Sequence, residues 1–189
     1  MLPEGTCARE GLSLPAKSRY DPLRTDEKGH LPMTGADRKN LVELLKPVSG
    51  MIAGGLVDSR LESRLNADIP ATGAIFRKIE AFCHKAIDDG WMCSQGSAGR
   101  RFGRVLEPSP DTDNLSVDVV DLVDIAGPHH RHPTGEICMI MPVTESARFD
   151  GHGAGWCVNP PGSAHRPTVS NGRALVLYLL PEGKIEFSA

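Results

Sequence analysis

The chain has 189 residues, which suits one domain of ordinary size with a substantial buried core. Its formal net charge of -3 and its isoelectric point near 6.2 argue against a polyanion-binding surface, so we expect no nucleic-acid partner. No apolar run reaches the roughly 18 residues that a membrane-spanning helix needs, and the N-terminus lacks an apolar signal core. We therefore expect no membrane association and a small-molecule partner.

The cysteines bear on the compartment. There are five, an odd number, and no two of them form a Cys-x-x-Cys pair. Several stand among apolar residues, as buried free thiols usually do. Because this usage is typical of a reducing environment, we expect a cytoplasmic protein.

The first half of the chain divides into two segments by composition. Residues 1–34 are rich in proline, glycine and charge and show no hydrophobic period, which predicts a flexible extension. Residues 35–95 show helical spacing of apolar side chains, which predicts an N-terminal helical segment. The expected helices start from an N-cap at Thr34 or Asp37 and end near Pro47, lie around 56–65, and run from 72 to about 89.

Residues 96–189 have the character of strands. The predicted strands are 101–106, 116–125, 136–141, 155–159 and 174–180, separated by glycine, proline and aspartate clusters. The continuous apolar run over 175–180 is typical of a central strand that is buried on both faces. Many short strands after a helical block indicate a mainly β fold, an antiparallel sandwich or barrel with N-terminal helices.

The richest cluster of ionisable side chains spans residues 129–136. His130 and His132 are two residues apart, so on a strand they point to the same face and can share one ion. Glu136 has the same parity, but Pro133 and Gly135 interrupt the strand, so its reach depends on a turn or bulge there. Imidazole and carboxylate groups are ligands that first-row divalent metals accept.

Two motifs in this region resemble those of the cupins. His130-x-His132-x-x-x-Glu136 resembles the first cupin motif, and Pro160-x-Gly162-x-x-His165 resembles the second. The second is degenerate, with Val169 where a cupin usually has asparagine. The resemblance implies a cupin-like antiparallel jelly-roll barrel over 96–189, with His130, His132, Glu136 and His165 as ligands of one divalent metal. Fe, Mn, Zn, Ni and Co are not distinguished by such a ligand set.

A narrower resemblance covers most of the chain after the extension. Residues 130–142, 147–151, 155–156, 161–165 and 173–183 resemble the 4-hydroxylaminobenzoate lyase family of bacterial nitrobenzoate breakdown. The resemblance implies conversion of 4-hydroxylaminobenzoate to 3,4-dihydroxybenzoate (protocatechuate) with release of ammonia. That reaction needs no nicotinamide or flavin, and the sequence has no dinucleotide fingerprint or phosphate loop.

The resemblance to this lyase family also implies roles for individual residues. Glu136 and His130 are the expected catalytic residues, with Glu136 as a metal ligand first and a proton shuttle second. An aromatic carboxylate substrate needs a cation, and arginine suits a carboxylate because its guanidinium donates two parallel hydrogen bonds. The cluster over 99–104 supplies the preferred clamp, with Arg101 and Arg104. Trp156 and Tyr178 are candidates to stack on the substrate ring.

Two other functions are compatible with the same residues. A cupin dioxygenase or isomerase acting on a small aromatic acid would use the same metal ligands, and a non-catalytic cupin would bind a small molecule without turnover. Oxygen uptake with a catechol would favour the dioxygenase, and tight binding without turnover would favour the binding protein. Because cupin barrels often pair through exposed strand edges, the architecture also suggests a homodimer.

Overall fold

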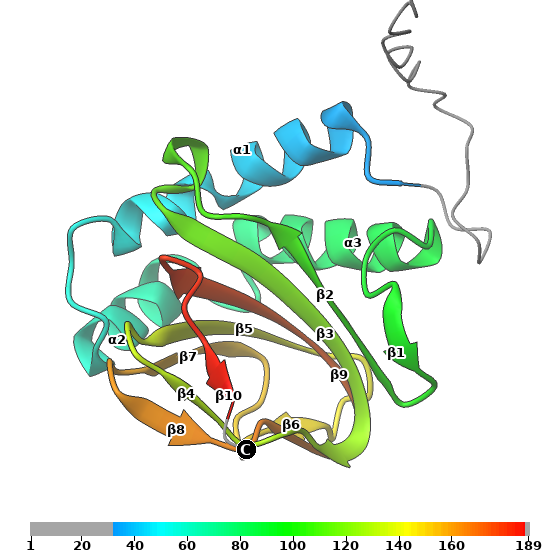
Figure 1. The fold of residues 1–189 in the computed structure, drawn as a ribbon. Coiled ribbons are helices and arrows are strands. Elements are labelled where there is room, and N and C mark those ends of the chain that lie inside the picture. Colours follow the sequence, from blue (N-terminus) through cyan, green and yellow to red (C-terminus); the bar gives the residue numbers. More distant parts are fainter. Residues whose placement is uncertain (1–31, 188–189) are drawn as a thin grey trace, which may run out of the picture.

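The computed structural model describes residues 32–187, so the extension predicted over 1–34 lies almost entirely outside the described residues. Three helices precede the strands in this part of the chain (Figure 1), and none of the three is long and apolar enough to cross a membrane. The helices are α1 (Gly35–Ile52), α2 (Ser59–Asp68) and α3 (Ala74–Asp88). The strands are β1 (Gln95–Ser97), β2 (Arg100–Leu106), β3 (Leu115–Ala126), β4 (His130–His132), β5 (Glu136–Pro142), β6 (Arg148–Phe149), β7 (Gly155–Asn159), β8 (Ser163–His165), β9 (Thr168–Pro181) and β10 (Glu186–Phe187), with a 3₁₀ turn at Pro110–Thr112.

Helix α1 begins where the sequence predicts and ends later. Thr34 is its N-cap, and a capping box joins it to Asp37 through hydrogen bonds of 3.1 Å and 3.0 Å. The helix does not end at Pro47 but continues to Ile52, which corrects the prediction. Val48 and Ile52 are buried beyond the proline, and burying two such side chains contributes about 3–6 kcal/mol. This gain offsets the roughly 3 kcal/mol that a proline costs inside a helix.

The larger sheet contains β1, β2, β3, β9, β5 and β7 in that order, and β6 pairs with β9. All of its strand pairs in the described part of the chain are antiparallel. β9 lies between β3 and β5, and each residue over 174–180 is buried. The prediction of a central strand that is buried on both faces is therefore confirmed.

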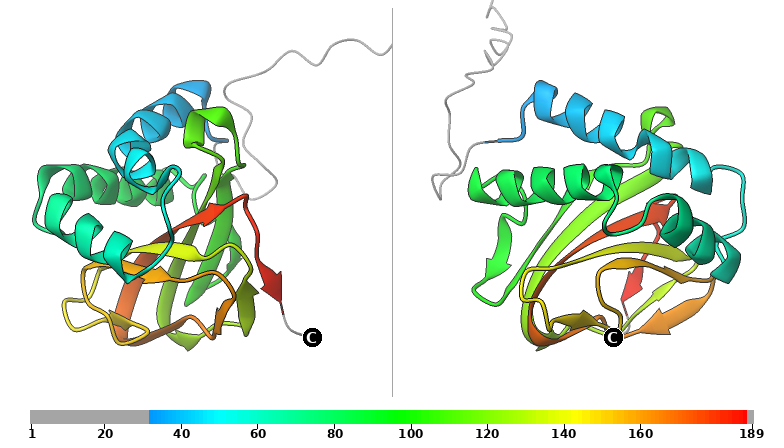
Figure 2. Two further views of the ribbon diagram at one scale, coloured as in Figure 1. Left: turned by 90° about the vertical axis from the view of Figure 1, so that its left-hand side faces the viewer. Right: turned by 180° about the vertical axis from the view of Figure 1, so that it is seen from behind.

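The two faces of this sheet pack against different partners. Figures 1 and 2 show the helices gathered on one side of it. Strand side chains alternate, so Val119, Met139 and Leu177 join the core that the helices cover. Cys138, Val176 and Tyr178 belong to a second apolar cluster on the opposite face.

A smaller sheet with the order β10, β4, β8 belongs to this opposite side (Figure 1). Short connections join it to the larger sheet, because β3 leads into β4 and β8 leads into β9. The two connections lie together, since the Gly127 amide donates to the Pro167 carbonyl at 2.8 Å. A Cβ on Gly127 would lie 2.8 Å from the Pro167 ring, so only glycine allows this approach.

The predicted mainly β, antiparallel fold class with an N-terminal helical segment is confirmed. Among residues 32–187 the strands pair as two sheets, and no strand pair joins the two sheets into one continuous barrel. The site lies on the side of the larger sheet that faces away from the helices.

Candidate metal centre and active site

Strand β4 places its two histidines as the spacing predicts. His130 and His132 are buried and the intervening Arg131 is exposed, so the two imidazoles point to one side of the strand. Arg131 lies near Glu186 of β10, with 3.8 Å between the charged atoms. β4 therefore separates an interior pair of histidines from a solvated arginine.

A tight turn brings Glu136 back to the pair. The Gly135 amide donates to the His132 carbonyl at 3.2 Å, and β5 begins at Glu136. Gly135 has a φ of +89°, and a Cβ there would lie 2.7 Å from Val57 and 3.0 Å from the Asn159 carbonyl. Glycine is thus required at this position by both conformation and space.

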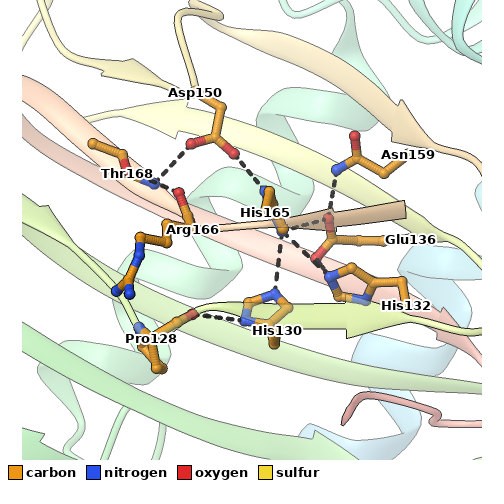
Figure 3. A network of polar contacts seen from close by, with 9 residues as sticks. All are labelled: Pro128, His130, His132, Glu136, Asp150, Asn159, His165, Arg166 and Thr168. Atoms are coloured by element: carbon orange, nitrogen blue, oxygen red, sulfur yellow. Dashed lines mark hydrogen bonds and ion pairs between the residues drawn. The ribbon is translucent and has the colours of Figure 1, made fainter. Parts of the chain in front are cut away.

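His165 comes from the neighbouring strand. β8 pairs antiparallel with β4 so that His165 lies opposite His130 in the register. The Gly162 amide donates to the His132 carbonyl at 2.8 Å, which ties the turn before β8 to β4. The strand pair itself therefore fixes the third imidazole beside the first two (Figure 3).

The four side chains converge on one point. One donor atom from each of His130, His132, Glu136 and His165 lies within 4.8 Å of the others. The Nε2 atom of His165 is 3.1 Å from that of His130 and 3.3 Å from that of His132. The Glu136 carboxylate oxygens lie 3.1 Å from His132 Nε2 and 3.4 Å from His165 Nε2. Adjacent donors bound about 2.1 Å from one metal ion lie roughly 3.0–3.4 Å apart, so these separations fit a divalent ion.

Two of the imidazoles are oriented from behind by oxygen atoms (Figure 3). The Nδ1 atom of His130 is 3.1 Å from the Pro128 carbonyl, and that of His165 is 2.7 Å from an Asp150 carboxylate oxygen. An acceptor at Nδ1 favours the tautomer whose Nε2 atom carries a free lone pair. The 3.1 Å between the Nε2 atoms of His130 and His165 fits either a shared proton or a metal ion bound by both. The Nδ1 atom of His132 is buried and has no hydrogen-bond partner among the described residues.

Burial keeps two of the histidines neutral. Desolvation, with the charge of His165 beside it, lowers the pKa of His130 to about 4. Desolvation and the neighbouring histidines lower the pKa of His132 to about 3. A neutral imidazole is the form that ligates a metal, so neither histidine has to lose a proton at neutral pH.

The other two side chains are shifted upward. Burial raises the pKa of Glu136, against the opposing effects of His165 and of the Asn159 amide, which donates to its carboxylate at 2.7 Å. Burial by itself would lower the pKa of His165. Its hydrogen bond to Asp150 and the charges of Glu136 and Asp150 outweigh burial, so the pKa is raised above its ordinary value. Glu136 and His165 are therefore the two members of the cluster that hold a proton most readily.

A cavity of about 170 Å³ borders the cluster. His130 and Glu136 line it, whereas His132 and His165 do not. Most of its wall is apolar and comes from β2, β3, β9 and the C-terminal residues Ile185 and Phe187. A molecule in this cavity would contact His130 and Glu136 and would be separated by them from His132 and His165.

The structure distributes the four predicted substrate-binding residues over both faces of the larger sheet. Arg104 and Tyr178 line the cavity. Arg101 is absent from the cavity wall and bonds the buried Asp121 on the other face. Trp156 is also absent, because it packs edge-on against Phe76 of α3 and donates its indole N–H to the Ile69 carbonyl at 2.8 Å. Arg101 and Trp156 therefore do not enter the substrate site that we propose below.

Asp150 and Asn159 were not among the residues predicted from the sequence. Asp150 lies in a turn after β6, where its other carboxylate oxygen accepts a hydrogen bond from the Thr168 amide at 2.8 Å. Asn159 ends β7 opposite Glu136 in the register. A ligating histidine usually has a carboxylate or carbonyl behind it, but nothing in the sequence indicates which one.

Comparison with known proteins gives a consistent result. The family model described as PnbB, 4-hydroxylaminobenzoate lyase, matches residues 43–187. The chain belongs to this family. It is 26% identical over 167 residues to the 4-hydroxylaminobenzoate lyase of Pseudomonas putida, which covers 79% of this chain and 95% of the relative. It is also 26% identical over 158 residues to the enzyme of the same name from Nocardioides sp. (strain LMS-CY), with 79% of this chain and 94% of the relative covered.

Solved structures with some likeness include an RmlC-like cupin protein from Ralstonia eutropha JMP134, with a TM-score of 0.38 and 16% identity, covering 52% of this chain and 66% of that one. A cupin-like protein from Thermotoga maritima MSB8 has a TM-score of 0.32 and 15% identity, covering 52% of this chain and 86% of that one.

Proposed function

We propose that this protein is a 4-hydroxylaminobenzoate lyase that forms 3,4-dihydroxybenzoate and releases ammonia in the degradation of nitroaromatic compounds. Membership of the lyase family supports the reaction class. The alignment with both named relatives spans nearly their whole length, so the chain contains the counterpart of almost the entire enzyme.

The observation that carries the proposal is the cavity beside the histidine cluster. Its volume is about 170 Å³ and its wall is mostly apolar. An apolar cavity of roughly 150 Å³ accepts one benzene ring, so this one suits a single substituted ring. His130 and Glu136 stand at its boundary, where they would contact a polar substituent of that ring.

The proposed reaction balances without an external oxidant. The N–O bond of the hydroxylamine breaks, and its oxygen leaves as water after protonation. Water then adds at the ring carbon ortho to nitrogen, and hydrolysis of the resulting imine places the second oxygen and releases ammonia. One water is consumed overall, and reduction of the N–O bond matches oxidation of the ring.

Glu136 is the residue we propose as the proton donor to the leaving oxygen. Burial raises the pKa of its carboxyl group, and the Asn159 amide orients it. We propose that the imidazole ring of His130, which also borders the cavity, fixes the position of the hydroxylamine group by direct packing, because its Nδ1 atom faces the Pro128 carbonyl and its Nε2 atom faces His165. A divalent ion held by His130, His132, Glu136 and His165 would supply Lewis acidity to the same group.

The cavity wall contributes orientation. Tyr178 and Arg104 line it, and we propose that the aromatic face of Tyr178 contacts the substrate ring. Aromatic pairs prefer offset or edge-to-face packing, which would hold the ring in one orientation relative to Glu136. The cytoplasmic location and the homodimer expected above stay predictions.

The deciding experiment is an incubation with 4-hydroxylaminobenzoate in the absence of oxygen. Ammonia and 3,4-dihydroxybenzoate are assayed together, before and after chelation and after divalent metals are returned. We expect equal amounts of the two products, loss on chelation and recovery with metal. If chelation leaves the amounts of both products unchanged, the lyase activity stands and the histidines act as acid-base groups without a metal.

The absence of products would contradict the lyase. Oxygen uptake with a catechol would then identify a dioxygenase, and binding of an aromatic acid without turnover would identify a non-catalytic protein.

A further inference from the structure

Strand β2 presents arginines to both faces of the larger sheet. Its side chains alternate, so Arg100, Phe102 and Arg104 share the face that borders the cavity, and all three line it. Arg101 has the opposite parity and lies outside the cavity wall. Two cations of this strand, Arg100 and Arg104, can therefore meet an anionic group in the cavity.

Arg104 already has partners for every nitrogen of its guanidinium group. Its Nε donates to Asp118 at 2.9 Å, its Nη1 to Glu107 at 3.2 Å and its Nη2 to the Gly183 carbonyl at 3.1 Å. Asp118 in turn accepts from the Ser116 hydroxyl at 2.7 Å. Three of its five N–H donors are thus engaged, and Asp118 and Glu107 already neutralise its charge, so Arg104 is a poorer partner for a substrate carboxylate than an unpaired arginine.

Arg100 has no such partners. Among residues 32–187 its guanidinium makes no hydrogen bond or ion pair with a protein group, and its Cζ lies 5.5 Å from the centre of the Phe102 ring. It is an exposed residue that also lines the cavity, so it stands where the cavity meets solvent. A guanidinium held against an aromatic ring keeps its N–H donors available to a ligand.

We propose that Arg100 binds the carboxylate of an aromatic acid substrate and thereby selects for that class of ligand. This inference rests on the proposed function, whose substrate carries its carboxylate on the ring carbon opposite the reacting nitrogen. The apolar side chains of Phe102, Val120 and Leu122 lie in the same wall and accommodate the ring. Arg104, which also lines the cavity, is bonded to Asp118 and Gly183 and is not the carboxylate partner in this proposal.

Arg100→Ala and Arg100→Lys test the assignment, with Arg60→Ala as the matched control because Arg60 is an exposed arginine of α2 outside the cavity wall. Two reactive substrates are compared: 4-hydroxylaminobenzoate, and phenylhydroxylamine, which lacks the carboxylate. Binding of 4-aminobenzoate, which has no N–O bond to break, is measured by calorimetry.

We expect Arg100→Ala to raise the KM for 4-hydroxylaminobenzoate and the Kd for 4-aminobenzoate roughly 10- to 100-fold, the loss that a charged hydrogen bond brings. Arg100→Lys should lie between wild type and alanine, because lysine keeps the charge without the paired donors. The KM for phenylhydroxylamine should change less than about twofold, and Arg60→Ala should match wild type.

A KM and a Kd within about twofold of wild type in Arg100→Ala would overturn the assignment, as would equal losses with both substrates. If wild type turns over neither substrate, the proposed function fails, while the Kd for 4-aminobenzoate still decides the role of Arg100. Wild type that binds no 4-aminobenzoate would overturn the assignment as well.

Discussion

The face of the larger sheet that packs against the helices carries an apolar core and the paired Asp121, whereas the opposite face carries Glu136 and borders the cavity. The same strands supply both faces. In β5, Ile137 and Met139 join the helix-covered core, while Glu136 and Cys138 point to the other side. Because side chains alternate along each strand, one sheet combines a stabilising core on one face with a polar site on the other.

The largest expected effect lies on the site face. His165→Ala removes one of the four converging donors and should lower the bound divalent metal to less than about a tenth of the wild-type amount. Lyase activity should fall at least about 1,000-fold, because a metal site with a missing ligand loses both the ion and its orientation. Metal analysis and turnover under the same conditions check this.

The control for this variant is His84→Ala, which removes a histidine from α3 on the other side of the sheet. It should retain wild-type metal content and activity. Equal metal content in His165→Ala and wild type would contradict the ligand assignment.

The next effect lies on the helix face and concerns stability. Leu177 of β9 is fully buried in the core that the helices cover. Leu177→Ala should lower the free energy of unfolding by about 2–5 kcal/mol, because it removes apolar contacts and leaves a void. Denaturant unfolding measures the loss.

In the folded fraction of Leu177→Ala, metal content should stay that of wild type. A variant that loses metal in proportion to stability would show that the two faces are not independent.

A smaller effect is expected behind the site. Asp150→Asn keeps the shape of the side chain but removes the carboxylate that lies 2.7 Å from His165 Nδ1. Metal affinity should fall about 10- to 100-fold, as is usual when the group behind a ligating histidine is lost. Titration against a competing chelator measures the affinity, and an unchanged value would exclude a positioning role for Asp150.

The smallest effect concerns the acid dependence of stability. Burial alone would raise the pKa of Asp121, but hydrogen bonds and charge from Arg173 and Arg101 lower it below its ordinary value. The carboxylate therefore contributes stability above about pH 4, and that contribution is lost as the pH falls through the lowered pKa.

Asp121→Asn should cost about 1.5 kcal/mol at pH 7 and remove this part of the acid dependence. Unfolding curves from pH 7 to pH 3 check both. Parallel pH profiles in wild type and variant would contradict the account.

The local order of the fold could be predicted from the sequence, because apolar periodicity reports directly on burial. The run over 175–180 identified the central strand, and of the two N-caps predicted for α1, Thr34 and Asp37, the structure has Thr34. The predicted helix end at Pro47 was wrong because the cost of a proline inside a helix was outweighed by burial of side chains beyond it. Only the apolar periodicity after the proline could have indicated this from the sequence.

The arginines of β2 show a second limit of prediction from the sequence. Alternation alone separates Arg100 and Arg104 from Arg101, so parity could have excluded Arg101 from the cavity face. Parity could not show that Asp118, Glu107 and Gly183 occupy Arg104 and leave Arg100 available, since these partners come from distant parts of the chain or from a turn.

The sequence by itself determined the ligand types, their spacing and the strand that presents His130 and His132, because these follow from residue identity and a period of two. The resemblance to the cupin motifs added His165 to this set. Only the tertiary structure decided that His165 lies opposite His130 on a paired strand, that Asp150 and Asn159 orient His165 and Glu136, and that the cavity meets His130 and Glu136. The physical reason is that these contacts depend on strand pairing and on turns that bring distant segments together. The free energy of such pairing cannot be inferred from any local sequence pattern.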